Sequence, residues 1–141
     1  MGNQWHTMSL RVYFEDTDAQ GVVYFANYLK FMERGRTEWL REMGIEQDWL
    51  LDEHGLCFAL THSDAKFLRP ARFNDLLQVR TRIVDYGRVR IELEQSVERA
   101  GELLCSARCV AACIDAGSFR PRRIPPAVAA QLIDAAGLNT G

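Results

Sequence analysis

The amino-acid sequence predicts an α+β fold in which an antiparallel sheet wraps around one long helix. Residues 25–43 form a single amphipathic segment whose apolar side chains recur every three or four positions, as on one face of a helix. After residue 55 the chain contains segments rich in β-branched and apolar residues. Within these segments apolar residues alternate with charged residues, which is typical of strands. With little helix elsewhere, the sheet is the element that can cover the long helix.

The length and composition indicate one domain, spanning residues 1–141, rather than two. A net charge of −2 gives no sign of a surface for nucleic acid, and no apolar run approaches the ~20 residues needed to span a bilayer. The first ten residues lack the basic start and apolar middle of a signal peptide. We therefore expect a cytoplasmic protein.

The order of elements follows from turn and helix-end signals. Gly44 and Gly55 stand where helices are expected to end, and Pro70 follows the first long strand. The expected elements are a strand at 9–15, a helix from 25–27 to 43–44, a helix at 46–53, strands at 56–68, 77–83, 89–97 and 103–115, and a helix at 126–136.

The long helix is expected to bury one stripe of apolar side chains against the sheet. Gly35 falls on this stripe, where it costs about 1 kcal/mol relative to Ala, so we expect a neighbouring backbone to approach closely there. The stripe consists of Phe25, Leu29, Met32, Trp39 and Met43.

Three of the four cysteines, Cys105, Cys109 and Cys113, stand four positions apart in a segment that indicates a strand buried on both faces. On a strand, this spacing separates them by ~13 Å each, too far to bind one metal ion. We expect them, with Cys57, to be free thiols in a reducing compartment.

An acidic turn, Asp16-Thr17-Asp18-Ala19-Gln20-Gly21, joins the first strand to the long helix. A carboxylate there lies beside unpaired N–H groups of the helix N-terminus, an arrangement suited to acyl transfer. Two other interpretations use the same residues. Asp16 and Asp18 could be turn formers only, or part of a calcium loop, although Asn27 stands where that loop requires a bidentate Glu.

A longer pattern around this turn is specific. It reads Glu15-Asp16-Thr17-Asp18-x-x-Gly21-Val22-Val23-Tyr24-x-x-x-Tyr28, and Phe67-Leu68-Arg69-Pro70-Ala71-Arg72-x-x-Asp75 follows downstream. Both segments resemble the hotdog-fold acyl-CoA thioesterases of the 4-hydroxybenzoyl-CoA thioesterase family. Within that family the chain looks most like the branch associated with the bacterial Tol–Pal system.

The resemblance implies roles for residues in the turn and at the start of the helix. Asp18 matches the catalytic carboxylate, acting as nucleophile or as general base on water. Phe25, where relatives often carry His or Tyr, would polarise the thioester carbonyl through its backbone N–H. Gly21 would form the tight turn and let the thioester approach the backbone, while Asp16 holds the turn.

The resemblance also indicates where substrate would bind. Tyr24, Asn27 and Tyr28 are candidates to line the pocket, although Asn27 and Tyr28 could equally be a helix cap and a core aromatic. Arg88 and Arg90 could clasp the phosphates of CoA, for which guanidinium groups are suited, or form a solvated surface.

The expected function is hydrolysis of an acyl-CoA thioester to a carboxylic acid and CoA, with no metal or redox cofactor. We expect a homodimer, doubled into a homotetramer as in similar enzymes, because an open edge strand and a shallow site suit a monomer poorly. The alternatives are an acyl carrier protein thioesterase and a non-catalytic module that binds acyl groups. The absence of His between His6 and His54 argues against hotdog dehydratase chemistry.

Overall fold

The computed structural model describes residues 5–137 of the chain. In chain order its elements are β1 (His6–Arg11), the one-turn helix η1 (Phe14–Asp16), α1 (Phe25–Glu42), α2 (Gln47–His54), β2 (Leu56–Phe67), β3 (Leu76–Tyr86), β4 (Arg90–Arg99), β5 (Glu102–Asp115) and α3 (Pro126–Ala135). No helix within these residues is long and apolar enough to cross a membrane.

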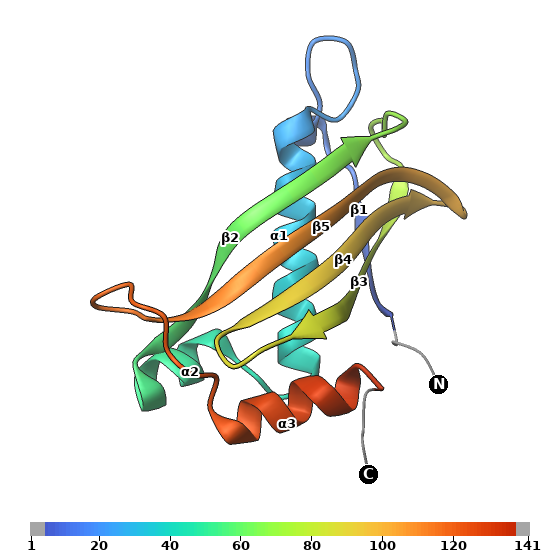
Figure 1. Cartoon of the computed structure of the whole chain (residues 1–141). Coiled ribbons are helices and arrows are strands. Elements are labelled where there is room, and N and C mark those ends of the chain that lie inside the picture. The colour runs from blue at the N-terminus through green and yellow to red at the C-terminus, as the bar shows by residue number, and fades with distance from the viewer. Residues whose placement is uncertain (1–4, 138–141) are drawn as a thin grey trace.

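The strands form one antiparallel sheet in the order β1-β3-β4-β5-β2, so that β1 and β2 are its edges. Figure 1 shows the sheet curving across α1, with α2 and α3 near one end and the loop before α1 at the other. The predicted α+β fold, an antiparallel sheet around one long helix, is therefore confirmed.

The central strands β3 and β4 turn alternate side chains toward α1, as their sequences predict. The outward positions carry charged pairs that bridge the two strands, including Arg80 with Glu98 and Arg82 with Glu94. The inward side chains are almost completely buried; they are Leu77, Val79, Thr81 and Ile83 on β3 and Ile91, Leu93, Gln95 and Val97 on β4.

Gly35 allows α1 to lie close to the sheet. A Cβ atom at this position would lie 2.7 Å from Cγ1 of Val79 and 3.3 Å from the hydroxyl of Thr81. Beside it, the side-chain amide of Gln95 donates hydrogen bonds of 2.9 Å to the Met32 carbonyl and to the Thr81 hydroxyl. The close approach that the sequence predicted is present, but strand side chains, not a neighbouring backbone, make it.

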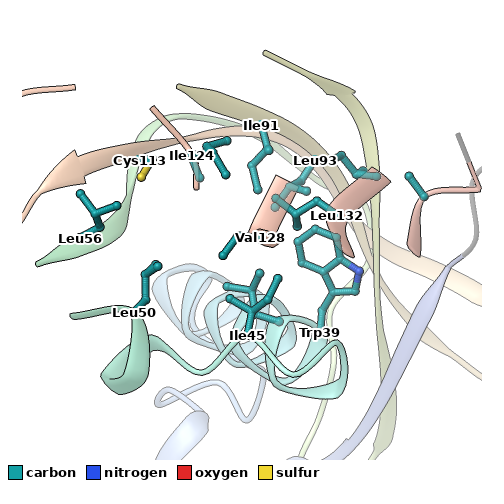
Figure 2. Packing of buried hydrophobic residues seen from close by; sticks show 14 of the residues in the cluster. Trp39, Ile45, Leu50, Leu56, Ile91, Leu93, Cys113, Ile124, Val128 and Leu132 are labelled. Atoms are coloured by element: carbon teal, nitrogen blue, oxygen red, sulfur yellow. The ribbon is translucent and has the colours of Figure 1, made fainter. Parts of the chain in front are cut away.

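Two hydrophobic clusters fill the space between α1 and the sheet. One lies around the first half of α1 and includes Phe31, Met32 and Leu104. The other joins the second half of α1 to α2, α3 and the sheet, and Figure 2 shows its side chains converging from all of these elements. Its labelled members are Trp39, Ile45, Leu50, Leu56, Ile91, Leu93, Cys113, Ile124, Val128 and Leu132.

The buried stripe of α1 differs from the predicted one in the first two turns. Phe25 and Leu29 are 63% and 46% exposed, so their assignment to the core was wrong, whereas Met32 and Trp39 are buried as predicted. Apolar residues surround the beginning of this helix, so the three-to-four spacing fits more than one face. The buried positions are Tyr28, Phe31, Met32, Gly35, Trp39 and Leu40.

The first strand is also shorter than predicted. It runs from His6 to Arg11 and not to Glu15, because residues 14–16 form the one-turn helix η1. Strand β5 begins one residue before its predicted start and ends where predicted, but only one of its faces is buried. Cys105, Cys109 and Cys113 lie on that face, and all three thiols are free, as predicted.

Candidate active site

The acidic turn reverses the chain between Thr17 and Val23, which form an antiparallel bridge. The Asp18 N–H donates to the Val22 carbonyl at 2.9 Å, and the Gly21 N–H donates to the Asp18 carbonyl at 3.0 Å. Gly21 has φ +80°, which explains the glycine, and a Cβ there would meet no atom within 4 Å. The turn therefore has open space beside its backbone.

The half-buried carboxylate of Asp18 is fixed by one of its two oxygens. Its Oδ1 accepts hydrogen bonds from the N–H groups of Gln20 at 2.9 Å and of Val22 at 3.4 Å. Within residues 5–137, no hydrogen bond or ion pair engages Oδ2. The turn thus orients the carboxylate and leaves one oxygen available for chemistry.

Asp16 holds the turn against the beginning of α1. Its carboxylate accepts a hydrogen bond of 2.8 Å from the Tyr13 N–H. Its backbone carbonyl accepts two more, from the Tyr24 N–H at 3.2 Å and from the side-chain amide of Asn27 at 2.7 Å. These contacts agree with the expected structural role of Asp16 and place the Asp18 turn directly before the helix.

The N-terminus of α1 supplies free backbone donors next to this turn. Tyr24 is the residue before the helix and has extended φ and ψ, so Phe25 is the first helical residue. The Asn27 N–H donates to the Tyr24 carbonyl at 2.8 Å, whereas the Phe25 N–H makes no hydrogen bond within the described part of the chain. The first N–H groups of a helix have no intrahelical acceptor, and the helix dipole favours negative charge there.

A cavity of about 240 Å³ opens beside the start of α1. The Phe67 ring lies 4.9 Å from the Phe25 ring and 5.7 Å from the Tyr28 ring, measured between centroids. The cavity is lined by Val22, Val23, Phe25, Tyr28, Phe67, Leu68, Arg69 and Pro70. Asp18 is not among these residues, but Val22, which exchanges hydrogen bonds with it, is.

Tyr28 contributes both its ring and its hydroxyl to this region. The ring lines the cavity, and the hydroxyl accepts a hydrogen bond of 2.9 Å from the Ala71 N–H and donates one of 3.4 Å to the Arg69 carbonyl. Burial raises the pKa of Tyr28, and the Ala71 N–H partly opposes that shift. Tyr28 is thus a core aromatic that also fixes the loop between β2 and β3.

The other residues expected to line the pocket are placed differently. Tyr24 is largely exposed beside Phe25 and does not line the cavity. The side-chain amide of Asn27 is engaged by the Asp16 carbonyl, so it positions the turn. Phe67 and Leu68 were not predicted as site residues; their signal was an apolar pair two residues before Pro70, at the end of the edge strand.

Arg88 and Arg90 lie at the opposite end of the sheet from Asp18. The start of β3 is next to the turn, since the Val12 N–H donates to the Asp75 carbonyl and Val22 forms a bridge with Arg72. The 11 residues of β3 then cover ~35 Å before the hairpin that carries the two arginines. Figure 1 shows this hairpin near α3, far from the loop before α1.

Comparisons with known proteins identify the family of this chain. Residues 12–132 match the family model described as the thioesterase-like superfamily. The chain is 40% identical over 121 residues to the acyl-CoA thioesterase YbgC of Haemophilus influenzae, covering 86% of this chain and 89% of that protein. It is 36% identical to the acyl-CoA thioester hydrolase YbgC of Escherichia coli, covering 86% and 91%.

A solved structure agrees in fold as well as in sequence. The probable thioesterase from Bartonella henselae superposes with a TM-score of 0.82 at 38% identity, covering 86% of this chain and all of that one. The resemblance to hotdog-fold thioesterases that the sequence indicated is therefore confirmed. The chain belongs to the thioesterase-like superfamily, has the hotdog fold of its members, and is similar to the YbgC acyl-CoA thioesterases.

Proposed function

We propose that the protein hydrolyses acyl-CoA thioesters at the Asp18 turn. The observation that supports this most directly is the carboxylate of Asp18, held by one oxygen and free at the other, immediately before a helix N-terminus with an unpaired N–H. A carboxylate next to preorganised donors matches the needs of thioester hydrolysis. The similarity to the YbgC enzymes supports the same substrate class.

The proposed reaction converts a thioester and water into a carboxylic acid and the thiol of CoA. The Phe25 N–H donates to the carbonyl oxygen and stabilises its negative charge as a tetrahedral intermediate forms. Asp18 either attacks the carbonyl carbon and expels the thiolate, giving an anhydride that water then opens, or removes a proton from the attacking water. Gly21 leaves room for the thioester beside the turn.

We assign the acyl or pantetheine portion of the substrate to the apolar cavity beside α1. Its walls include the aromatic rings of Phe25, Tyr28 and Phe67, which supply apolar surface for the substrate. Tyr24 flanks this region and is an exposed aromatic contact for the substrate, and Asn27 supports it by holding Asp16.

We assign Arg88 and Arg90 to the CoA phosphates of a substrate bound at a neighbouring subunit. Their distance along β3 from Asp18 of their own chain argues against contact within one subunit. Both side chains are exposed, and neither forms an ion pair within residues 5–137, so both are available to phosphate. This proposal therefore requires an oligomer.

We propose a homodimer formed through the edge strand β2, doubled into a homotetramer. The middle of β2, residues 60–64, is exposed on both faces, and Leu60, Phe67 and Leu68 are exposed apolar side chains along or next to this edge. Antiparallel pairing of two copies across a two-fold axis would cover the β2 edge of each copy. Unpaired thiols are consistent with the reducing cytoplasm as its location.

A release assay over short, long and aromatic acyl-CoA thioesters tests the proposed activity. The rate of CoA release should depend on Asp18.

A second assay tests the arginines. The double variant Arg88→Ala, Arg90→Ala should have a raised KM for acyl-CoA but an unchanged KM for a pantetheine thioester that lacks the nucleotide. This KM effect should shrink as salt rises, because exposed charges are screened. Absence of hydrolysis across the panel, or faster turnover of acyl carrier protein thioesters, would contradict the proposal.

A further inference from the structure

The loop between β2 and β3 links the cavity beside α1 to the acidic turn. Residues 68–70 line that cavity. The next two residues of the loop pair with the segment that follows the turn. The Val23 N–H donates to the Ala71 carbonyl at 2.8 Å, and Val22 forms an antiparallel bridge with Arg72. A displacement of this loop would therefore move both a wall of the cavity and the end of the acidic turn.

Val22 connects the loop to the carboxylate of Asp18. Its N–H donates to Asp18 Oδ1 at 3.4 Å, and its carbonyl accepts the Asp18 N–H at 2.9 Å. Val22 is thus bonded to Asp18 and bridged to the loop at Arg72. The orientation of the carboxylate therefore depends on where the loop holds Val22.

An ion pair between Arg99, at the end of β4, and Asp75, before β3, fixes this loop to the sheet. Nη1 of Arg99 donates to Asp75 Oδ2 at 2.7 Å and to the Pro70 carbonyl at 3.2 Å. The same Oδ2 accepts the Arg72 N–H at 2.9 Å. Nη2 of Arg99 donates to Glu102 at 2.7 Å, which orients the guanidinium. One guanidinium therefore holds the loop at Pro70 and, through Asp75, at Arg72.

The ion pair is only partly open to solvent. The side chains of Arg99 and Asp75 are 28% and 24% exposed, so solvent screens their attraction less than that of a surface pair. Burial alone would raise the pKa of Asp75, but the hydrogen bonds from Arg99 and from the Arg72 N–H lower it overall. The pair is therefore charged at neutral pH.

Tyr28 supports the same loop from α1. Its hydroxyl accepts the Ala71 N–H at 2.9 Å and donates to the Arg69 carbonyl at 3.4 Å. Tyr28 also lines the cavity, whereas Arg99 and Asp75 do not. A change in the Arg99–Asp75 pair therefore alters the support of the loop and leaves the side chains that line the cavity unchanged.

We propose that Arg99 and Asp75 are positioning residues for the hydrolysis and act on the Asp18 carboxylate through the loop and Val22. This inference rests on the proposed role of Asp18. Neither residue needs to contact substrate, because the chain of hydrogen bonds from Arg99 to Asp18 Oδ1 lies within the protein. A structural role alone would change stability but not the rate of each folded molecule.

A double-mutant cycle between Arg99→Gln and Asp18→Asn tests the proposal. In the wild-type background, Arg99→Gln should lower kcat by about tenfold, because a misplacement of ~1 Å can cost 10²-fold. In the Asp18→Asn background it should leave the residual single-turnover rate almost unchanged, since the carboxylate that it positions is gone. Losses of equal size in both backgrounds would overturn the proposal.

Amide hydrogen exchange tests the same link without relying on catalysis. In Arg99→Gln the Val23 N–H should exchange about tenfold faster, as expected when a hydrogen bond to a charged group is lost from its support. Unchanged exchange at Val23 would overturn the proposal. Faster exchange together with a wild-type rate in Asp18→Asn would support the link and contradict the proposed function instead.

Arg82→Gln is the matched control. Arg82 is also a partly exposed arginine that pairs with a carboxylate, that of Glu94, between β3 and β4. This variant should lose thermal stability but keep the wild-type kcat and the wild-type exchange at Val23. An equal fall in kcat in Arg82→Gln would show that loss of stability explains both results, and it would overturn the proposal.

A second variant keeps the test valid if Arg99→Gln fails to fold. Asp75→Asn retains an oxygen for the Arg72 N–H but removes the charge that holds Arg99. It should lower kcat and speed exchange at Val23 in the same directions, by smaller factors. A folded Asp75→Asn protein with wild-type kcat and wild-type exchange at Val23 would overturn the proposal.

Discussion

The side-chain amide of Asn27 donates a hydrogen bond of 2.7 Å to the backbone carbonyl of Asp16. This bond joins the first turn of α1 to the acidic turn that carries Asp18. The same carbonyl also accepts the Tyr24 N–H at 3.2 Å, so the two segments are linked by both backbone and side chain. The position of the proposed catalytic carboxylate relative to the helix N-terminus therefore depends on a residue that need not touch substrate.

Replacing Asn27 by Ala should lower kcat more than it lowers stability. One net hydrogen bond contributes about 1 kcal/mol, and the Tyr24 N–H remains to hold the Asp16 carbonyl. Asn27→Asp should be worse in both respects, because it directs a carboxylate at the carbonyl oxygen. Steady-state kinetics and thermal melting on each variant check this. A kcat of wild-type size in Asn27→Ala would show that the link is not needed.

Replacing Phe25 by Pro should lower the rate by ~10²–10³ and preserve the fold. Proline removes the N–H proposed to polarise the carbonyl, and it is tolerated at the first position of a helix. Phe25→Ala is the matched control: it removes the same ring but keeps the N–H, so it should change acyl preference more than rate. Full activity in a folded Pro variant would exclude the backbone donor.

Replacing Gly35 by Ala should destabilise the protein, although Ala in a helix is usually favoured over Gly by about 1 kcal/mol. The new Cβ would lie 2.7 Å from Cγ1 of Val79, a buried atom on β3 that has little room to move. Val79→Ala, destabilising by itself, should relieve this clash. In urea unfolding, the double variant should therefore lose less stability than the two single losses combined; strict additivity would contradict the close approach.

The stability of the protein should fall between pH 9 and pH 11 through Cys105. Burial raises the pKa of this thiol from 9.0 to about 11. Between those values the unfolded thiol has lost its proton while the folded one keeps it, so the contribution is complete below pH 9 and is lost as pH rises through 11. Melting temperatures of Cys105→Ala over this range should decline less steeply than those of the wild type. Parallel curves would refute the assignment.

The sequence predicted the fold because its strongest signals depend on local periodicity. The alternation of apolar and charged residues identified β3 and β4 as strands, and Gly44 and Gly55 marked the helix ends within a residue or two. The same rule failed at the start of α1, where Tyr24, Phe25, Tyr28 and Leu29 surround the helix with apolar groups. Only the packing of the turn and β2 decides which of them is buried.

The sequence predicted those parts of the candidate site whose residues lie close together along the chain. It did not predict the contacts between distant segments. Asp18, Gly21 and Phe25 lie within eight residues, and their pattern alone brought them together. Phe67 comes from an edge strand far along the chain from Phe25, so the contact between their rings was not visible in the sequence. Arg88 and Arg90 lie at the opposite end of the sheet from Asp18 within one subunit, so no local pattern in the chain could relate them.

Single-turnover hydrolysis of an acyl-CoA by Asp18→Asn, compared with Asp16→Asn, tests the central proposal most directly. The two variants remove charge from neighbouring carboxylates of one turn, but Asp16 Oδ2 accepts the Tyr13 N–H whereas Asp18 keeps one oxygen free. Asp18→Asn should melt near the wild-type temperature and lose most of the rate, and Asp16→Asn should lose stability but keep most of its rate per folded molecule. A folded Asp18→Asn protein with near-wild-type rate would contradict the proposal.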